Sequence, residues 1–364
     1  MTVQEVVDTI NSFAPLSYQE SYDNAGINIG NESMPVKAVL ITLDVTEAVV
    51  SEAVSIGANL IISHHPVIFK GIKQINNHSY TGRLIQQLIK NDITVYSGHT
   101  NVDVTWGGVN MKICEKLGLQ NTRVLEPMKE NLLKIVVFAP TEHAEQVREG
   151  MFKAGAGHIG DYDKCSYNLE GTGSFRGSDE TNPFVGEKGS IHYEPETRIE
   201  TVVPREKLRK VVRSMINAHP YEEVAYDVYP LLNEYQRAGM GMIGELPKSK
   251  NKADFLNHVK NTFRCEVLKY THMEKDELKK VAVCGGSGSF LLPKAISLGA
   301  DAIISADFKY HQYFDAEGKI MICDVGHYES EQFTKEIFYD LLTEKFTNFA
   351  VHLSKINTNP INFL

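Results

Sequence analysis

The chain has 364 residues, of which 42% are apolar and 23% charged, an ordinary globular composition and a length that favours two domains. Its formal net charge of −9 argues against general affinity for nucleic acid or an anionic membrane, since both require a positive field, although bound metal ions could still attract an anionic substrate. No apolar run approaches the roughly 20 residues that span a bilayer. No signal peptide is visible and the five cysteines are scattered, so we expect a cytoplasmic protein with reduced thiols.

The first part of the chain predicts alternating strands and helices. Apolar residues 36–45 predict a buried strand, and a helix closed by Gly57 leads into a second strand at 60–63. A third strand, 93–97, ends just before Gly98 and His99. Strands that alternate with helices are typical of an open, largely parallel sheet.

A region of different character covers residues 128–237. Its expected elements, in chain order, are a strand at 132–139, a helix at 142–154, glycine-rich passages at 155–160 and 171–177, a strand at 199–203, a helix at 205–218 and a strand at 222–229. This order predicts a small ferredoxin-like α+β module inserted between the two ends of the chain.

The last part of the chain repeats the first. Residues 55–63, SIGANLIIS, return as residues 297–305, SLGADAIIS. An apolar strand at 281–284 precedes the second copy, and a strand at 320–325 follows it. Agreement over three successive strands favours a duplicated three-layer α/β core with pseudo-twofold symmetry, made of residues 1–127 and 238–364.

Histidines and carboxylates follow three of these strands: His64, His65, Asp103, His327 and Glu331. Because the carboxyl ends of parallel strands meet at one edge of a sheet, we expect these side chains to converge. A lone histidine pair or a lone H-x-x-x-E motif is common without a metal, and only their joint placement indicates a site. Adjacent histidines can reach two neighbouring ions more easily than one tetrahedral ion, and a carboxylate can bridge two ions. The pattern predicts two divalent metal ions.

Other polar residues near strand ends are secondary candidates. His99 matches His327 by its position in the repeat and could be a metal ligand or, as we prefer, support one, and both His99 and His311 could donate a proton during catalysis. Asp307 and His311 could instead support the site or belong to an ordinary loop, and Asp44 could orient a ligand. The glycine-rich segment 285–289 could receive an anion, although a tight packing turn is the simpler interpretation.

Six segments together resemble the Nif-three-like dinuclear metal family, many of whose members are named GTP cyclohydrolase I type 2 homologues: 23–26 (DNAG), 43–46 (LDVT), 63–66 (SHHP), 99–103 (HTNVD), 285–288 (GGSG) and 326–331 (GHYESE). The inserted region, with GTGSFRG at 171–177 and HPYEE at 219–223, is similar to the PII/CutA-like module of the longer bacterial members.

The resemblance implies several properties of this chain. It places the metal ligands on His64, His65, Asp103, His327 and Glu331, with Glu331 bridging two ions. Zinc is the first expectation for those ions, with iron or manganese as alternatives. The resemblance also implies a toroidal homohexamer whose metal sites face its interior.

Two functions of different classes remain open from the sequence. The first is a metal-dependent hydrolase that opens the guanine ring of GTP with loss of formate, with His99 or His311 as the acid. The second is a metal-binding regulatory or sensor protein without turnover, which uses the PII/CutA-like insert. A ring that encircles DNA is disfavoured by the negative net charge.

Overall fold

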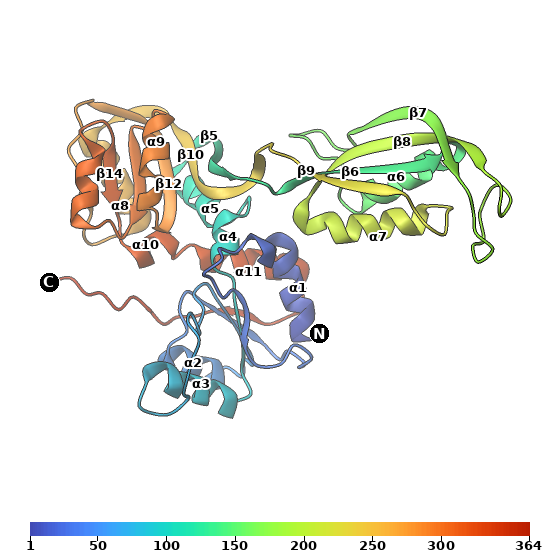
Figure 1. Ribbon diagram of the computed structural model, residues 1–364. Helices are drawn as coiled ribbons and strands as arrows, with labels where there is room; N and C mark the ends of the chain where they lie inside the picture. Colours follow the sequence, from blue (N-terminus) through green and yellow to red (C-terminus); the bar gives the residue numbers. More distant parts are fainter. The chain divides into compact units, whose positions relative to one another are not determined.

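The computed structural model describes all residues from 1 to 364, and the chain forms two compact units (Figure 1). One unit is discontinuous and contains Met1–Pro127 and Arg237–Leu364, while the other contains Met128–Gln236. The protein is of the mixed α/β class, as predicted. None of its helices combines the length and the apolar character needed to cross a bilayer.

The discontinuous unit contains a five-stranded sheet in the order β1-β4-β3-β2-β15. Its strands are β1 (Gly26–Ile29), β2 (Val39–Thr42), β3 (Leu60–Ser63), β4 (Thr94–Ser97) and β15 (Val351–Leu353). The strands from β4 to β15 are parallel, and β1 joins the edge antiparallel to β4. The helices that accompany this sheet in the sequence are α1 (Val3–Phe13), α2 (Glu47–Ser55) and α3 (Tyr80–Lys90).

A second sheet in the same unit has six strands in the order β11-β14-β13-β12-β10-β5. They are β5 (Gln120–Met128), β10 (Tyr235–Asn251), β11 (Lys269–Tyr270), β12 (Glu277–Ser287), β13 (Ala302–Ala306) and β14 (Met321–Asp324). The three strands β12, β13 and β14 are parallel, and β10 and β11 pair antiparallel with them. The unit also contains α5 (Val109–Leu117), α8 (Lys252–Phe263), α9 (Leu292–Ser297) and α11 (Thr334–Lys345).

Both sheets bury both of their faces, which explains why their central strands are apolar throughout. In β3, Ile61 packs against α2 and α3, while Ile62 enters a core that includes side chains of α1, α5, α8 and α11. In β13, Ile303 packs against α9 and Ile304 enters that same shared core. The helical layer is therefore common to the two sheets.

The parallel strands carry their functional residues to their carboxyl ends. The chain leaves β3 at Ser63 and β4 at Ser97, which are paired neighbours in the first sheet. In the second sheet, Ser305 in β13 is paired with Asp324 at the end of β14. Two one-turn helices follow these ends, α4 (Thr100–Val104) after β4 and α10 (His327–Glu331) after β14.

The continuous unit contains one antiparallel sheet in the order β7-β8-β6-β9. Its elements are β6 (Leu132–Pro140), α6 (Ala144–Lys153), β7 (Ser166–Phe175), β8 (His192–Pro204), α7 (Leu208–Ala218) and β9 (Tyr226–Pro230). The glycine-rich passage at 171–177 is not irregular over its whole length, because β7 runs through it to Phe175 and pairs with β8. Cross-strand hydrogen bonding outweighs the weak strand preference of glycine there.

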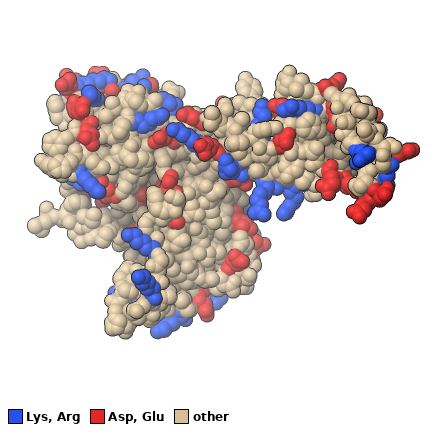
Figure 2. Space-filling model, viewed as in Figure 1, with Lys and Arg blue, Asp and Glu red and all other residues tan.

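Basic and acidic side chains are interspersed on the face shown in Figure 2, with no extended area of one sign. The surface therefore offers no broad electrostatic attraction on that face, and chemistry has to be sought in particular side-chain clusters.

Candidate metal centre

His64 is held rigidly at the end of β3. The backbone N–H groups of His64 and His65 both donate to the carbonyl of Leu43, at 3.1 Å each. The Nδ1 of His64 lies 2.8 Å from the carbonyl oxygen of Gly98, which accepts a hydrogen bond only from an Nδ1–H tautomer. His64 is fully buried, and burial lowers its pKa. Its Nε2 is therefore a lone-pair donor of the kind that metals bind.

His65 is oriented by a carboxylate on the neighbouring strand connection. Its Nδ1 lies 2.7 Å from Oδ1 of Asp44, and the other oxygen of Asp44 accepts a hydrogen bond from the Thr358 hydroxyl at 2.6 Å. Burial lowers the pKa of His65, but its hydrogen bonds to Asp44 and Glu331 outweigh burial and raise it to about 10. Asp44 thus does what the sequence suggested for it, since it orients a histidine of the cluster.

His327 and Glu331 occupy the two ends of α10. Gly326, with φ +95°, begins this turn, and the spacing of four residues puts both side chains on one face. The Nδ1 of His327 lies 2.6 Å from Oδ2 of Asp307, which also accepts from the Ser287 hydroxyl. Glu331 is only 3% exposed. Burial favours its protonated form, but the imidazoles around it hold its pKa well below the usual value.

Asp103 reaches the same place from α4. Its Oδ1 lies 3.6 Å from Nε2 of His64. Burial and the nearby Glu331 carboxylate raise the pKa of Asp103 well above its usual value. Two buried carboxylates this close would repel each other when ionised, so the arrangement favours a cation between them.

The five side chains form two groups that share Glu331. In one group, Oε2 of Glu331 lies 3.0 Å from Nε2 of His65 and 3.0 Å from Nε2 of His327, and the two nitrogens are 3.3 Å apart. In the other, Oε1 of Glu331 and Oδ1 of Asp103 each lie 3.6 Å from Nε2 of His64. Ligands about 2.1 Å from a tetrahedral ion are about 3.4 Å from one another, so both groups have the right dimensions.

Two buried polar atoms of the cluster, Nε2 of His64 and Oδ1 of Asp103, have no hydrogen-bond partner. Leaving one such atom unpaired costs about 1–3 kcal/mol, and two at one point are not expected in a site that only serves packing. A bound cation would satisfy both. The residues present therefore fit a metal.

His99 lies beside the cluster and is oriented in the same manner. Its Nδ1 lies 2.7 Å from Oδ1 of Asp23, and its ring centre is 5.2 Å from that of His64. Burial raises the pKa of Asp23, but hydrogen bonds from His99 and Thr100 outweigh burial and lower it to about 2. A ring nitrogen of His99 lies within 4.8 Å of ring nitrogens of His64 and His65. Its Nε2 is free to act on a bound molecule.

His311, the other candidate acid, lies elsewhere. It is exposed on the short helix η5 (Tyr310–Ala316), where its ring contacts those of Tyr310 and Phe314. It does not line the cavity beside the cluster. Within this chain, His99 is therefore the better placed of the two.

A cavity of about 320 Å³ opens beside the cluster. Besides the clustered residues, its walls include Tyr22, Phe69, Thr100, Met240, Cys284 and Phe290. Of these walls the sequence patterns included only Thr100, which, like Asp23, was recognised as part of a motif. Met240 and Cys284 lie within β10 and β12, while Tyr22 and Phe69 lie on connections, and neither periodicity nor spacing marks them as functional.

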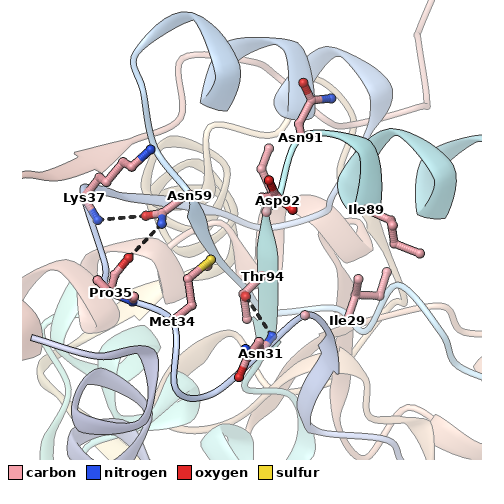
Figure 3. Close-up of a pocket in the computed structure, with 12 residues that line it drawn as sticks. Ile29, Asn31, Met34, Pro35, Lys37, Asn59, Ile89, Asn91, Asp92 and Thr94 are labelled. Atoms are coloured by element: carbon pink, nitrogen blue, oxygen red, sulfur yellow. Dashed lines mark hydrogen bonds between the residues drawn. The ribbon is translucent and has the colours of Figure 1, made fainter.

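A second cavity, of about 530 Å³, lies at the other end of the first sheet (Figure 3). It adjoins Asn59 and Thr94, which stand at the amino ends of β3 and β4. Asn59 accepts a hydrogen bond from the backbone of Lys37 at 2.8 Å, and Thr94 accepts one from the backbone of Asn31 at 3.1 Å. The side chains of Asn59 and Thr94 are thus used within the fold, and the histidines and carboxylates of the cluster gather at the carboxyl ends of the strands instead.

Fold and site together define a mixed α/β protein with a buried group of histidines and carboxylates that could hold metal ions. The family model described as Duf34/NIF3 (NGG1p interacting factor 3) matches residues 1–360. This chain therefore belongs to the Duf34/NIF3 family, which confirms the resemblance seen in its motifs.

Relatives match over the full length of the chain. A protein of Halalkalibacterium halodurans named GTP cyclohydrolase 1 type 2 homolog is 41% identical over 367 residues, which cover 99% of this chain and 98% of that protein. A Bacillus subtilis protein of the same name is 39% identical with the same coverage. The crystal structure of a Bacillus cereus protein related to NIF3 superposes with a TM-score of 0.88 at 41% identity, covering 100% of this chain and 99% of that one. A Staphylococcus aureus structure gives a TM-score of 0.79 at 27% identity, again covering 100% and 99%.

Proposed function

We propose that this protein binds two divalent metal ions through His64, His65, Asp103, His327 and Glu331 and uses them for hydrolysis. The observation that carries the proposal is the position of Glu331, whose two carboxylate oxygens each belong to a different group of ligand atoms. A bridging carboxylate is the usual way to hold two ions close together. Zinc suits this nitrogen and oxygen set, and iron or manganese would also be accepted.

The fold supports an interpretation of the core as a duplication. The strand sets β2-β3-β4 and β12-β13-β14 are parallel in the same order, and each has an antiparallel strand at the outer edge. We assign residues 1–127 and 238–364 to this pseudo-twofold metal-binding core. The two sheets differ at their other edge, where β15 is parallel to β2 but β10 is antiparallel to β12.

When bound, the two ions would supply Lewis acidity and activate water for attack on an electrophilic carbon. The surrounding residues would keep that chemistry in place. Asp44 and Asp307 accept from the Nδ1 atoms of His65 and His327, which leaves both Nε2 atoms for the metal. The buried position of Glu331 excludes bulk water from its carboxylate.

His99 is our candidate for the proton donor. Asp23 accepts from Nδ1 of His99 and so fixes the orientation of the ring. The Nε2 atom beside the cluster could then deliver a proton to a leaving nitrogen and recover it from water. The exposed His311 instead contacts the rings of Tyr310 and Phe314.

The names of the relatives suggest GTP as the substrate. One water would add to the imidazole-ring carbon of guanine and open the ring to a formamide, and a second would release that carbon as formate. His99 would protonate the nitrogen that departs in the first step. The resemblance further supports a cytoplasmic homohexamer, a toroid with the metal sites facing inward.

A second candidate function is regulation without turnover. The unit of residues 128–236 has the element order β6-α6-β7-β8-α7-β9 and the sheet order β7-β8-β6-β9. This order supports a ferredoxin-like, PII/CutA-like module over residues 128–237. Such a module could bind a small ligand while the metal ions are sensed or stored.

Formate release from GTP tests the hydrolase directly. Protein loaded with zinc, manganese or anaerobic ferrous iron should release formate, and Glu331→Ala should abolish release. Absence of formate with all three metals would rule out the cyclohydrolase and leave another hydrolase or the regulatory protein.

A further inference from the structure

The cavity beside the metal cluster has exposed aromatic walls. Phe69, Tyr22 and Phe290 line it, with 44%, 62% and 57% of their surfaces exposed. We call these three residues the aromatic wall. Large apolar rings left exposed around a polar centre are typical of ligand contact, because core packing would have buried them.

The same cavity contains no lysine or arginine among the residues that line it. Its carboxylates are those of Asp103 and Glu331, and three histidines also line it. Proteins that recognise a phosphoryl group usually supply arginine or lysine to it. Apart from the metal ions, this cavity therefore offers little to a phosphate and much to a flat, uncharged ring.

Three consecutive residues before β1 connect two members of the aromatic wall, Tyr22 and Phe69, to His99. Asp23 accepts from the His99 ring at 2.7 Å, and the side chain of Asn24 donates to the carbonyl of Ile68 at 2.6 Å. Tyr22 precedes this pair and Phe69 follows Ile68. The hydrogen bonds of two adjacent residues thus fix Tyr22, Phe69 and His99 relative to one another.

Phe69 itself is well anchored although it lies on a long connection. Residues 64–79, between β3 and α3, contain no helix or strand. Val67 donates its backbone N–H to Asn28 at 2.9 Å, and Val67 and Ile68 pack on the core beneath α2 and α3. The Phe69 ring centre is 6.4 Å from that of Tyr22 and 6.0 Å from that of His99, the latter pair meeting edge to face at 80°.

We infer that the site takes a planar nitrogen heterocycle of the nucleobase type, ring first. The ring stacks on the aromatic wall with its edge toward His99 and the metal cluster, while any phosphoryl groups remain toward solvent. Stacking on aromatic side chains suits such rings because each has a π face. This inference rests on the proposed hydrolase and states which end of its substrate enters.

Calorimetric titration of the zinc-loaded full-length protein with guanosine tests the inference without any need for turnover. Guanosine has the ring and no phosphate, so it should bind the wild type. Phe69→Leu and Tyr22→Leu should each weaken binding roughly tenfold, whereas Phe69→Tyr should keep it. Tyr162→Leu removes an exposed aromatic ring of the other unit and should have no effect. Zinc content should be the same in all five proteins.

Two results would overturn the inference. One is a wild type that binds inorganic phosphate but not guanosine. The other is unchanged guanosine affinity in both leucine variants while their zinc content is normal. Failure of the proposed hydrolase would give a different result. If the protein releases no formate but still binds guanosine in a manner that depends on Phe69, turnover is contradicted and the inference about the aromatic wall is supported.

Discussion

The Glu331 carboxylate lies against Gly286 so closely that a Cβ at that glycine would be 2.2 Å from Oε1. Gly286 also has φ +63°, a conformation that other residues adopt with strain. This glycine near the end of β12 is therefore needed to make room for the residue shared by both ligand groups. Its role is to admit a carboxylate, which explains the GGSG motif better than an anion-binding turn does.

Gly286→Ala should displace Glu331 and weaken zinc binding, roughly 10- to 100-fold by the usual effect of disturbing a metal ligand's support. Gly57→Ala is a matched control, because Gly57 has φ +71° but no atom within 4 Å of its added Cβ. Both variants should lose about 1 kcal/mol of stability from backbone strain, measured by denaturant unfolding. Equal zinc affinity in the Gly286→Ala and Gly57→Ala variants would show that Gly286 is needed only for its backbone conformation.

Asp307 should matter for metal binding although it does not belong to either ligand group. Asp307→Ala removes the acceptor at Nδ1 of His327, so we expect zinc affinity to fall roughly 10- to 100-fold in competition with a chromogenic chelator. Asp315→Ala is the control, because Asp315 is an exposed aspartate of the nearby helix η5. A fall of the same size in the control would point to a general charge effect.

Exchange of single side chains separates the two candidate proton donors. His99→Gln should lower kcat by roughly 100-fold or more with zinc content unchanged, and His311→Gln should leave kcat near the wild-type value. Asp23→Asn should resemble His99→Gln, since it removes the carboxylate that orients the His99 ring. A large loss in His311→Gln alone would reverse the assignment.

Metal binding should release protons. Burial lowers the pKa values of His65 and His327, but hydrogen bonds to carboxylates outweigh burial and raise them to about 10 and about 9. Both rings are therefore protonated in the metal-free protein at pH 8, and metal requires their neutral nitrogens. Zinc affinity should therefore rise with pH up to about 9–10. The stability of the metal-free protein should change in the opposite direction, because groups with raised pKa values stabilise the fold less as the pH rises through those values.

The number of protons released can be counted from the binding enthalpy in buffers of different ionisation heat. We expect the imidazoles of His65 and His327 to release about two per chain at pH 8, and His327→Gln to release about one fewer than the wild type. A zinc-binding enthalpy that is the same in all buffers would contradict the release of these protons.

Strand ends and adjacent ligands could be predicted from the sequence because they follow local patterns. The apolar run at 60–63 predicts a strand that ends immediately before His64, and β3 has these bounds. The spacing of His327 and Glu331 predicts one helical face, and α10 provides it. Parallel strands buried on both faces are continuous apolar runs, which makes them easy to recognise.

The hydrogen bonds that hold the histidines and their carboxylate partners in place could not be predicted in this way. Thr358 reaches Asp44 across 314 positions of the chain, and Asp23 reaches His99 across 76. No periodicity links such pairs, and only the folded chain brings them together. The edge strands beside β2 and β12 were missed for a similar reason, since their pairing depends on neighbours far away in sequence.

The most direct test of the account is the number of zinc ions bound per chain. The wild-type protein, loaded with zinc and freed of excess, should contain two ions per chain by elemental analysis, and Glu331→Ala should lose both because both ligand groups depend on that carboxylate. One ion per wild-type chain, or two retained after Glu331→Ala, would contradict a bridged pair of ions at this site.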